Sequence, residues 1–458
     1  MENQIKFGTD GIRGLANKLP ITVEVALKIG QALGVLVKKE THKKGSGHVV
    51  LIGKDTRISG YMIEQALASG LNSMGVSVQL VGPLPTPGVG FLTKDMRCDA
   101  GVVISASHNL YMDNGIKLFG SDGFKISSEI EKSIEKLLLE DLSKYLLESK
   151  DIGRTRRIED ASGRYVVSVK NAFPHPLHLE GLRIVVDSAH GAAYKVAPSI
   201  FEELGAKVIN IGNHPNGFNI NKNFGALCPE TLQKAVIEHK ADLGIAVDGD
   251  ADRVLMVDEI GQILSGDHIL GLCGISLKKQ NLLKNNSIVL TPMSSIALIN
   301  CLKKENITVH TAAVGDKNVV ALMKEKDCIL GGENSGHVIF LKHSTTGDAC
   351  IAALKVLELM KKENKKLSQM REIFKTPLQI NHSVKLKKVM GQSLVLSDIP
   401  NYSDTLKKLE SNLGGDARIY VRPSGTEPIV RIFLEGEDKV LLDKSLTTMT
   451  EFLEKNIN

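Results

Sequence analysis

An internal repeat of one strand–helix–strand unit constrains the fold of this chain more than any other feature. The three copies begin at Val49, Arg183 and Ser287, with the strands V-V-L-I-G-K-D, R-I-V-V-D and S-I-V-L. These strands are short, β-branched and almost continuously apolar, which is typical of parallel strands covered by helices on both faces. Each unit predicts a right-handed βαβ crossover, so three copies predict three related α/β domains.

The last part of the chain has a different pattern. From Leu378 it reads as strand, helix, strand, loop and strand, which predicts a small α+β domain. A chain of 458 residues is too long for one core, because single cores stop growing near ~250–300 residues. We therefore expect three α/β domains with mixed sheets and a C-terminal α+β domain, occupying residues 1–150, 151–254, 255–375 and 376–458.

Composition and charge exclude several classes of protein. The formal net charge is only +5, aromatic residues make up 4% of the chain and Trp is absent, so no nucleic-acid surface is expected. No apolar run approaches the ~18 residues that span a bilayer, and the first residues do not resemble a secretion signal. The six cysteines form no C-x-x-C pair, which predicts reduced thiols. We expect a cytoplasmic protein without membrane or nucleic-acid partners.

A turn of small residues follows a predicted buried strand in G-V-V-I-S-A-S-H-N, where Ser107 is the second serine. A serine in such a turn can present its hydroxyl to a cleft. No G-x-S-x-G elbow surrounds it, so acyl transfer has weak support. A turn in which the serine caps the backbone explains this segment at least as well, so the residues alone leave its role open.

Three aspartates alternate with small residues in D-G-D-A-D-R, at Asp248, Asp250 and Asp252. Carboxylates this close repel one another, and a hard cation is their natural neutraliser. An EF-hand loop does not fit, because Arg253 occupies the place of its glycine and an apolar strand follows. A solvated acidic turn is the alternative, which the cost of this charge density disfavours.

Two glycine-containing loops carry polar side chains that suit a sugar or an anion. G-G-E-N-S-G-H offers Glu333, Asn334 and Ser335 as partners for sugar hydroxyls, although polar glycine loops are common. The N-terminal F-G-T-D-G-I-R-G places Arg13 in a second glycine-rich loop.

The segment R-P-S-G-T-E-P in the last domain predicts a phosphate-binding loop. Arg422 offers a bidentate fork for phosphate. Hydroxyl groups and backbone N–H groups for an anion come from Ser424, Gly425 and Thr426. A plain hairpin turn is the alternative, and both interpretations can hold together.

Taken together, these motifs and their order resemble the phosphohexomutase superfamily (the α-D-phosphohexomutases). S-A-S-H-N, D-G-D-A-D-R, G-E-N-S-G-H and R-P-S-G-T occur once in each predicted domain, in order, and the resemblance covers essentially the whole chain. The resemblance implies a heart-shaped enzyme of four domains that moves a phosphate between two positions of a hexose.

The resemblance also implies roles for the motif residues. Ser107 would carry the phosphate, and one of its oxygens would join the three aspartates in holding one Mg²⁺. The sugar would be read by Glu333, Asn334 and Ser335. The phosphate that is not reacting would be held by Arg422, Ser424, Gly425 and Thr426. Further positions lining the active site would be Arg13, Lys117, Arg253 and His337.

Two points within this resemblance stay open. Lys117 and His337 are both candidates for the general base that accepts the sugar hydroxyl proton. The superfamily usually has Pro after S-H-N, whereas this chain has Leu110, which predicts a looser serine loop.

The opening motif and E-N-S are most similar to superfamily members that act on glucosamine phosphates. They imply interconversion of glucosamine 6-phosphate and glucosamine 1-phosphate through a hexosamine 1,6-bisphosphate, which also acts as the activator. This reaction would supply UDP-N-acetylglucosamine and cell-wall synthesis.

Mannose or glucose phosphates are the alternative substrates. A non-catalytic sensor of sugar phosphates is disfavoured, because the serine and the aspartates are all present. The expected partner is a small phosphosugar, and a homodimer is left open.

Overall fold

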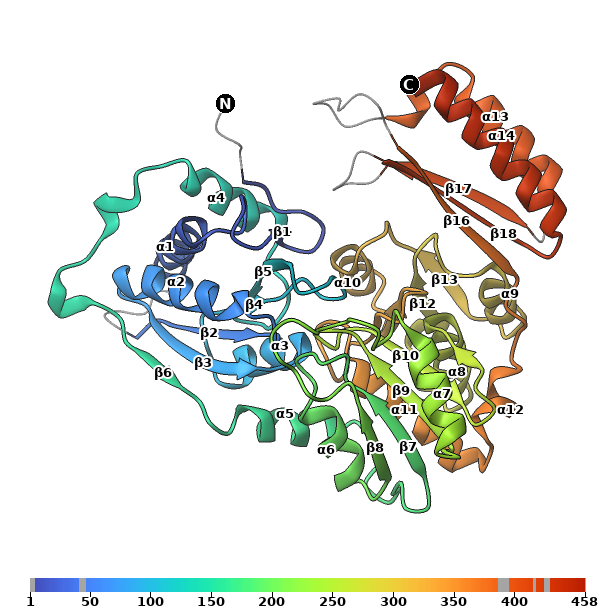
Figure 1. Ribbon diagram of the computed structural model, residues 1–458, viewed down its shortest axis with the longest axis horizontal. Coiled ribbons are helices and arrows are strands. Elements are labelled where there is room, and N and C mark those ends of the chain that lie inside the picture. The colour runs from blue at the N-terminus through green and yellow to red at the C-terminus, as the bar shows by residue number, and fades with distance from the viewer. Residues whose placement is uncertain (1–4, 41–46, 386–394, 415–416, 424–428, 458) are drawn as a thin grey trace.

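The computed structural model describes residues 5–40, 47–385, 395–414, 417–423 and 429–457, which form four sheets in chain order (Figure 1). The first sheet has the strand order β1-β5-β4-β2-β3-β6. Its strands are β1 (Ile12–Leu15), β2 (Val49–Lys54), β3 (Ser77–Pro83), β4 (Ala100–Ile104), β5 (Asp113–Gly120) and β6 (Thr155–Arg157). β2, β3, β4 and β6 are parallel, and β5 pairs antiparallel with both β4 and the edge strand β1.

Helices cover both faces of the first sheet, as the continuous apolar strands predict. Alternate residues of β2, Val50 and Ile52, pack with helices α1 (Val23–Glu40), α2 (Ser59–Ser73) and α4 (Ser128–Leu138). Leu51 points to the other face and packs with α3 (Thr86–Asp95). Because side chains along a strand point to opposite faces, this alternation buries the strand twice.

The second and third sheets repeat the α/β pattern. The second has the order β11-β10-β9-β7-β8, and the third has the order β13-β12-β14-β15. The second contains β7 (Arg183–Asp187), β8 (Lys207–Ile211), β9 (Leu243–Val247), β10 (Val254–Asp258) and β11 (Ile263–Leu264), with α5 (Ala161–Lys170), α6 (Val196–Glu203) and α7 (Pro229–Glu238). The third contains β12 (Ser287–Leu290), β13 (Thr308–Thr311), β14 (Leu330–Gly332) and β15 (Val338–Phe340), with α8 (Gly266–Lys279), α9 (Ile296–Lys304), α10 (Asp316–Glu325), α11 (Ala349–Glu363) and α12 (Leu367–Arg371).

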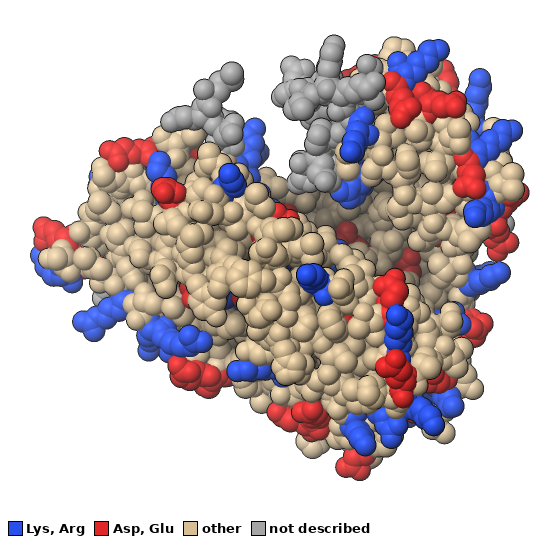
Figure 2. All heavy atoms as spheres, viewed as in Figure 1, with Lys and Arg blue, Asp and Glu red and all other residues tan. Residues whose placement is uncertain are grey.

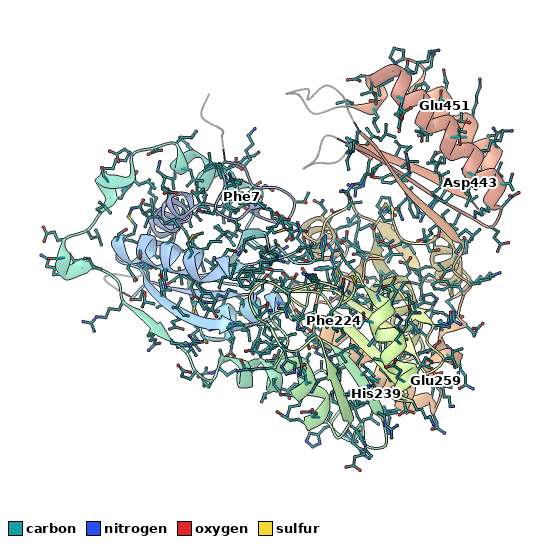
Figure 3. The ribbon with its side chains drawn as sticks, viewed as in Figure 1. Phe7, Phe224, His239, Glu259, Asp443 and Glu451 are labelled. Carbon is teal, nitrogen blue, oxygen red and sulfur yellow. The ribbon has the colours of Figure 1, made fainter. Side chains whose placement is uncertain are left out.

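The fourth sheet is antiparallel and has helices on one face only. It contains β16 (Leu378–Lys385), β18 (Ile429–Gly436) and β17 (Arg418–Pro423) in that order, with α13 (Tyr402–Leu413) and α14 (Lys439–Ile457). Figure 3 shows Asp443 and Glu451 on the helical layer, on the side away from the other three sheets. Short 3₁₀ turns lie at Leu142–Tyr145, Ser149–Asp151, Lys284–Asn286 and Leu396–Asp398. The predicted fold class, three α/β domains with mixed sheets and a C-terminal α+β domain, is confirmed.

The apolar core is shared by the first three parts of the chain. One buried cluster runs from Leu51 through Ile184 to Leu290, so the three α/β sheets are packed into a single body. The fourth sheet has a separate core around Val430. The surface is hollowed between the part that contains the first sheet and the C-terminal part (Figure 2).

The sheets extend slightly past the domain boundaries that the sequence suggested. β6, at residues 155–157, pairs with β3 of the first sheet, and β10 and β11 belong to the second sheet. The boundaries near residues 150, 254 and 375 stay predictions. Within the described residues, no helix is both long and apolar enough to cross a membrane.

Candidate active site

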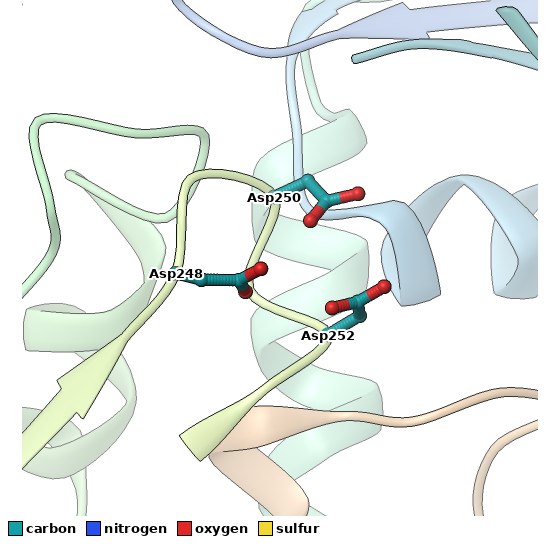
Figure 4. A group of neighbouring side chains, drawn as sticks. All are labelled: Asp248, Asp250 and Asp252. Carbon is teal, nitrogen blue, oxygen red and sulfur yellow. The ribbon is translucent and has the colours of Figure 1, made fainter. Parts of the chain in front are cut away.

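The three aspartates of D-G-D-A-D-R lie in the loop that joins β9 to β10. Each contributes a carboxylate oxygen to a group in which all three atoms lie within 4.8 Å of one another. Figure 4 shows their side chains facing a common space. All three are buried, and Asp250 Oδ1 and Asp252 Oδ1 have no hydrogen-bond partner among the described residues. Burial, and then Asp252 and Asp250, raise the pKa of Asp248 well above its usual value.

Ser107 lies in the loop after β4, and its hydroxyl contacts this carboxylate group. Its Oγ donates to Asp248 Oδ2 at 2.6 Å, although the two residues belong to different sheets. The side chain is buried, and the backbone adopts a left-handed φ of 50°. The loops after β4 and β9 therefore bring the predicted nucleophile and the predicted metal ligands into contact.

Lys117 of β5 contacts the aspartates through its ammonium group. Its Nζ is 2.8 Å from Asp250 Oδ2, 3.0 Å from Asp10 Oδ2 and 3.7 Å from Asp252 Oδ2. Burial alone would lower the pKa of Lys117, but these three carboxylates raise it well above the usual lysine value. Thr86, at the start of α3, also donates to Asp250 Oδ2 at 2.6 Å. The site therefore holds Lys117 as a cation.

A second group of charges connects the first and third sheets. Asp10 pairs with both Arg13 and Lys125, and Lys125 Nζ is 2.5 Å from Asp316 Oδ2. His337, between β14 and β15, places Nε2 3.8 Å from Asp316 Oδ2 and 3.9 Å from an oxygen of Asp252. Neither ring nitrogen of His337 has a hydrogen-bond partner within the described part of the chain.

Two more side chains face the serine and the aspartates. Arg253 donates its backbone N–H to Asp248 Oδ1 at 3.1 Å, and its Nε lies 3.8 Å from Asp252 Oδ1. Burial, followed by the cations Arg253 and Arg13, lowers the pKa of His108 to about 3. His108 is therefore neutral at physiological pH, and the positive charge beside Ser107 comes from arginine and lysine.

The predicted sugar loop is the turn between β14 and β15. Glu333 is buried and accepts the N–H of Gly315 at 3.2 Å through Oε1. Asn334 is half-buried and Ser335 is exposed. Arg422 lies near the end of β17, where burial and Arg431 lower its pKa while Glu333 opposes this shift.

The predicted phosphate loop can be followed only in part. Ser424, Gly425 and Thr426 lie outside the described residues. Of the predicted phosphate-binding residues, Arg422 alone lies within the described part of the chain, and Glu333 of the sugar loop opposes the lowering of its pKa by burial.

Several residues that build the site were not predicted from the sequence. They are Asp10, Asp55, Arg57, Thr86, Lys125, Asn221 and Asp316. Two of them could have been predicted from their place in the chain. Asp55 and Arg57 directly follow β2, and β2 lies beside β4, the strand that leads to Ser107. Loops after adjacent parallel strands emerge at the same sheet edge, which is where ligands bind in α/β folds. Asn221 and Asp316 come from other sheets and have no comparable local signal.

Four family models match the chain in order. They are described as phosphoglucomutase/phosphomannomutase α/β/α domain I, residues 4–144, domain II, residues 163–261, domain III, residues 265–376, and the C-terminal domain, residues 358–450.

Curated relatives and solved structures agree with these matches. The phosphoglucosamine mutase of Bdellovibrio bacteriovorus is 54% identical over 99% of this chain and 98% of its own length. That of Geotalea uraniireducens is 48% identical over 98% of each chain. A phosphoglucomutase/phosphomannomutase family protein from Burkholderia thailandensis has a TM-score of 0.79, at 23% identity and with 99% and 98% coverage. The Aspergillus fumigatus N-acetylphosphoglucosamine mutase, in complex with GlcNAc-6P and magnesium, has a TM-score of 0.69 at 16% identity, with 100% and 96% coverage.

The two low-identity structures share the fold, and the curated relatives share about half of the sequence over nearly the whole length. This chain belongs to the phosphohexomutase superfamily, in which it is most like the phosphoglucosamine mutases.

Proposed function

We propose that this chain is an isomerase that interconverts glucosamine 6-phosphate and glucosamine 1-phosphate through a phosphorylated Ser107. The contact between Ser107 Oγ and Asp248 Oδ2, inside a buried group of three carboxylates, carries this proposal. This contact places a hydroxyl nucleophile where a metal cation and the basic side chains of the site can neutralise the charge of a phosphate on Ser107. Curated relatives named phosphoglucosamine mutase, 46–54% identical, support the amino sugar as substrate.

The residues present fit one Mg²⁺. Asp248, Asp250 and Asp252 offer hard oxygen ligands, and two of their buried oxygens have no hydrogen-bond partner among the described residues. When bound, Mg²⁺ would withdraw negative charge from the phosphate on Ser107 and so lower the barrier to transfer.

Basic side chains would stabilise the charge on the phosphoryl group as it moves. Lys117 is held as a cation by Asp10, Asp250 and Asp252, and Arg13 and Arg253 flank the same carboxylates. Phosphoryl transfer depends mainly on such positioning and charge neutralisation. We therefore assign these three residues to charge stabilisation.

His337 is the better candidate for the general base. Lys117 would first have to lose a proton that its three carboxylate neighbours stabilise. His337 lies in the same group of residues, and neither ring nitrogen makes a hydrogen bond within the described structure, so one nitrogen can accept a hydroxyl proton.

The reaction needs two transfers in opposite directions. In the first, the bond between phosphorus and Ser107 Oγ breaks, a bond to the sugar O1 forms, and the O1 proton passes to His337. The resulting 1,6-bisphosphate turns around, the bond between O6 and the phosphorus of the 6-phosphate breaks, a bond from that phosphorus to Ser107 Oγ forms, and His337 gives its proton to O6. Glu333, Asn334 and Ser335 would hold the sugar in both orientations.

The phosphate that is not reacting would bind the loop that starts at Arg422 and contains Ser424, Gly425 and Thr426. A guanidinium fork accepts either phosphate of the bisphosphate equally well. A hexose 1,6-bisphosphate would also load unphosphorylated Ser107, which makes it the proposed activator.

The remaining assignments follow from this chemistry. A small phosphosugar is the proposed partner, and a homodimer stays a prediction. We propose the cytoplasm as the compartment, since all six cysteines are free thiols, as a reducing environment favours. Residues 1–150, 151–254, 255–375 and 376–458 are the proposed domains.

The test is a comparison of substrates. Purified protein is mixed with Mg²⁺ and a trace of glucose 1,6-bisphosphate, and glucosamine, mannose and glucose 6-phosphates are followed separately by phosphorus NMR. Rapid appearance of the 1-phosphate from glucosamine 6-phosphate alone supports the proposal. A preference for mannose or glucose would keep the mechanism but refute the amino-sugar assignment.

A further inference from the structure

The backbone around Ser107 is held by a buried arginine that lies outside all four motifs. Arg57, in the loop after β2, is completely buried. Its Nη2 donates to the carbonyl oxygens of Ser107 at 3.0 Å and Asn109 at 2.7 Å. Its Nη1 donates to the carbonyl oxygen of Asp113 at 3.0 Å and to that of Leu110. One side chain therefore binds four carbonyl groups of the serine loop.

The charge of Arg57 is balanced by Asp55. Asp55 Oδ2 accepts from Arg57 Nε at 2.8 Å and from Ser105 Oγ at 2.6 Å. Ser105 Oγ in turn accepts the backbone N–H of Ser107 at 2.9 Å. A buried ion pair is favourable only when its remaining hydrogen-bonding groups are satisfied, and the serine loop satisfies them here. The ion pair and the serine loop thus form one connected network.

A second N–H₂ group reaches the same carbonyl oxygens from another sheet. Asn221, in the loop between β8 and α7, donates from Nδ2 to Ser107 O at 2.8 Å and to Asn109 O at 2.9 Å. Each of these oxygens therefore accepts one N–H from Arg57 and one from Asn221. A carbonyl oxygen has two lone pairs, so both are used.

The serine needs this support because its backbone is strained. Ser107 has a φ of 50°, and a non-glycine residue in the left-handed region costs about 1–3 kcal/mol unless its surroundings impose it. The carbonyl oxygen of Leu110, three residues after Ser107, is bound by the same Arg57, so the restraint extends along the loop.

We propose that Arg57 and Asn221 are positioning residues, which together hold Ser107 in the conformation that brings Oγ to Asp248. Asn221 also makes this conformation depend on contact between the first and second domains. The proposal rests on the proposed transfer at Ser107. Since Glu333 and Arg422 lie on other sheets, loosening the serine loop should slow transfer without weakening binding of the sugar phosphate.

The experiment uses two full-length variants. Arg57→Lys keeps the charge but loses the planar fork, and Asn221→Asp keeps the size but replaces two donors with a carboxylate oxygen. Arg183→Lys is the matched control, because Arg183 also donates to a carbonyl oxygen, that of His239, far from the serine loop. Each protein is phosphorylated with glucose 1,6-bisphosphate, and the single-turnover transfer from Ser107, kcat, KM and Tm are measured.

For both variants we expect kcat and the single-turnover rate to fall together by roughly 10²-fold, because a small displacement of a reacting group slows the chemical step by about this factor. KM should stay within about twofold of wild type, and the control should match wild type. A folded variant with the wild-type transfer rate would overturn the proposal, as would a rise in KM alone. If Arg57→Lys does not fold, the transfer rate of Asn221→Asp tests the proposal, and circular dichroism measures the folded fraction of this variant.

The same measurements separate this proposal from the proposed function. A wild-type enzyme that prefers glucose phosphate would refute the amino-sugar assignment alone. The ratio of variant to wild-type rates on that substrate would still test the two positioning residues. If wild-type Ser107 accepts no phosphate, both proposals fail.

Discussion

At the scale of single residues, the site places opposite charges in contact within a few ångströms. Asp250 accepts from Lys117 at 2.8 Å and from Thr86 at 2.6 Å, while its second oxygen has no partner among the described residues. This free oxygen is the feature that a bound cation would use. Asp250 therefore contacts Lys117 through one oxygen and leaves the other available to a cation.

Replacement of Asp250 by asparagine should remove the metal response. The amide keeps the size of the side chain but loses the charge that neutralises both a divalent cation and Lys117. We expect kcat to fall by roughly 10²-fold or more and the dependence of rate on Mg²⁺ concentration to disappear. Steady-state rates measured across a Mg²⁺ titration check this. Asp404→Asn, at an exposed position on α13, is the control, and an unchanged Mg²⁺ titration for Asp250→Asn would refute the ligand assignment.

At the scale of elements, the active site is built where the loop after β4 meets the loop after β9. Gly249 lies at this contact, and a Cβ atom there would stand 2.6 Å from Ser107 O and 2.7 Å from Asn221 Nδ2. The closeness of the two backbones explains why small residues separate the aspartates.

Gly249→Ala should therefore push the two loops apart. We expect a loss of about 1–3 kcal/mol in the free energy of unfolding, as for other overpacked sites, together with a fall in kcat. Gly163→Ala is the control, because a Cβ on this glycine of α5 meets no atom within 4 Å. Denaturant unfolding and steady-state assays give both quantities. Wild-type kcat in Gly249→Ala would contradict the described contact.

A buried carboxyl group also connects two helices of the third domain. Asp267 of α8 accepts the N–H of Ser295, at the start of α9, at 2.7 Å. Burial raises its pKa to about 7, although the N–H of Ser295 opposes the shift. The folded protein thus binds a proton more tightly than the unfolded chain, so this contribution to stability is complete below about pH 4 and is lost as pH rises towards 7.

Asp267→Asn should remove this pH dependence, because the amide can still accept from Ser295 but does not ionise. Between about pH 4 and pH 7 we expect the free energy of unfolding to fall less steeply in the variant than in wild type. Urea unfolding at a series of pH values measures this difference. Asp242→Asn, at an exposed position, should behave as wild type, and parallel curves for Asp267→Asn and wild type would refute the assignment.

At the scale of the whole molecule, hydrogen bonds from the Arg418–Glu435 ion pair of the fourth sheet connect the fourth domain to the third. Arg418 of β17 donates to Glu435 Oε2 at 2.9 Å and to the carbonyl oxygens of Pro292, at 2.9 Å, and Ser294. Glu435 Oε2 also accepts the N–H of Ile296 at the start of α9, at 3.0 Å. Since the fourth sheet has its own core, this junction helps to determine where Arg422 lies relative to the sugar loop.

Arg418→Ala should loosen that junction. We expect KM for the sugar phosphate to rise by roughly tenfold and kcat to change less, because the chemistry at Ser107 lies in other domains. Steady-state kinetics test this, with Lys444→Ala, at an exposed position on α14, as the control. A fall in kcat with an unchanged KM would contradict this role.

Local elements could be predicted from the sequence, whereas contacts made by the packing of those elements could not. The repeated strands expected from Val49, Arg183 and Ser287 begin at those residues as β2, β7 and β12, because apolar patterning is local. The residues alone did not join Ser107 to Asp248, because their contact depends on the packing of two sheets; the family resemblance implied that they meet at one metal ion. Arg57 and Asn221 bind carbonyl groups that any residue carries, so no side-chain pattern at the serine loop indicates them. Packing, within the first sheet for Arg57 and between domains for Asn221, determines these parts of the site.

The proposal that Ser107 carries the phosphate is tested most directly by locating the phosphate on the protein during turnover. Wild-type protein and Ser107→Ala are each incubated with Mg²⁺ and glucose 1,6-bisphosphate, and the phosphorylated peptide is identified by mass spectrometry. Glucosamine 6-phosphate is then added. The account predicts one phosphate on Ser107 of the wild type, its transfer to glucosamine 6-phosphate at a rate no slower than kcat, and neither phosphate nor turnover in Ser107→Ala. Full mutase activity in Ser107→Ala, or a stable phosphate on another residue, would contradict it.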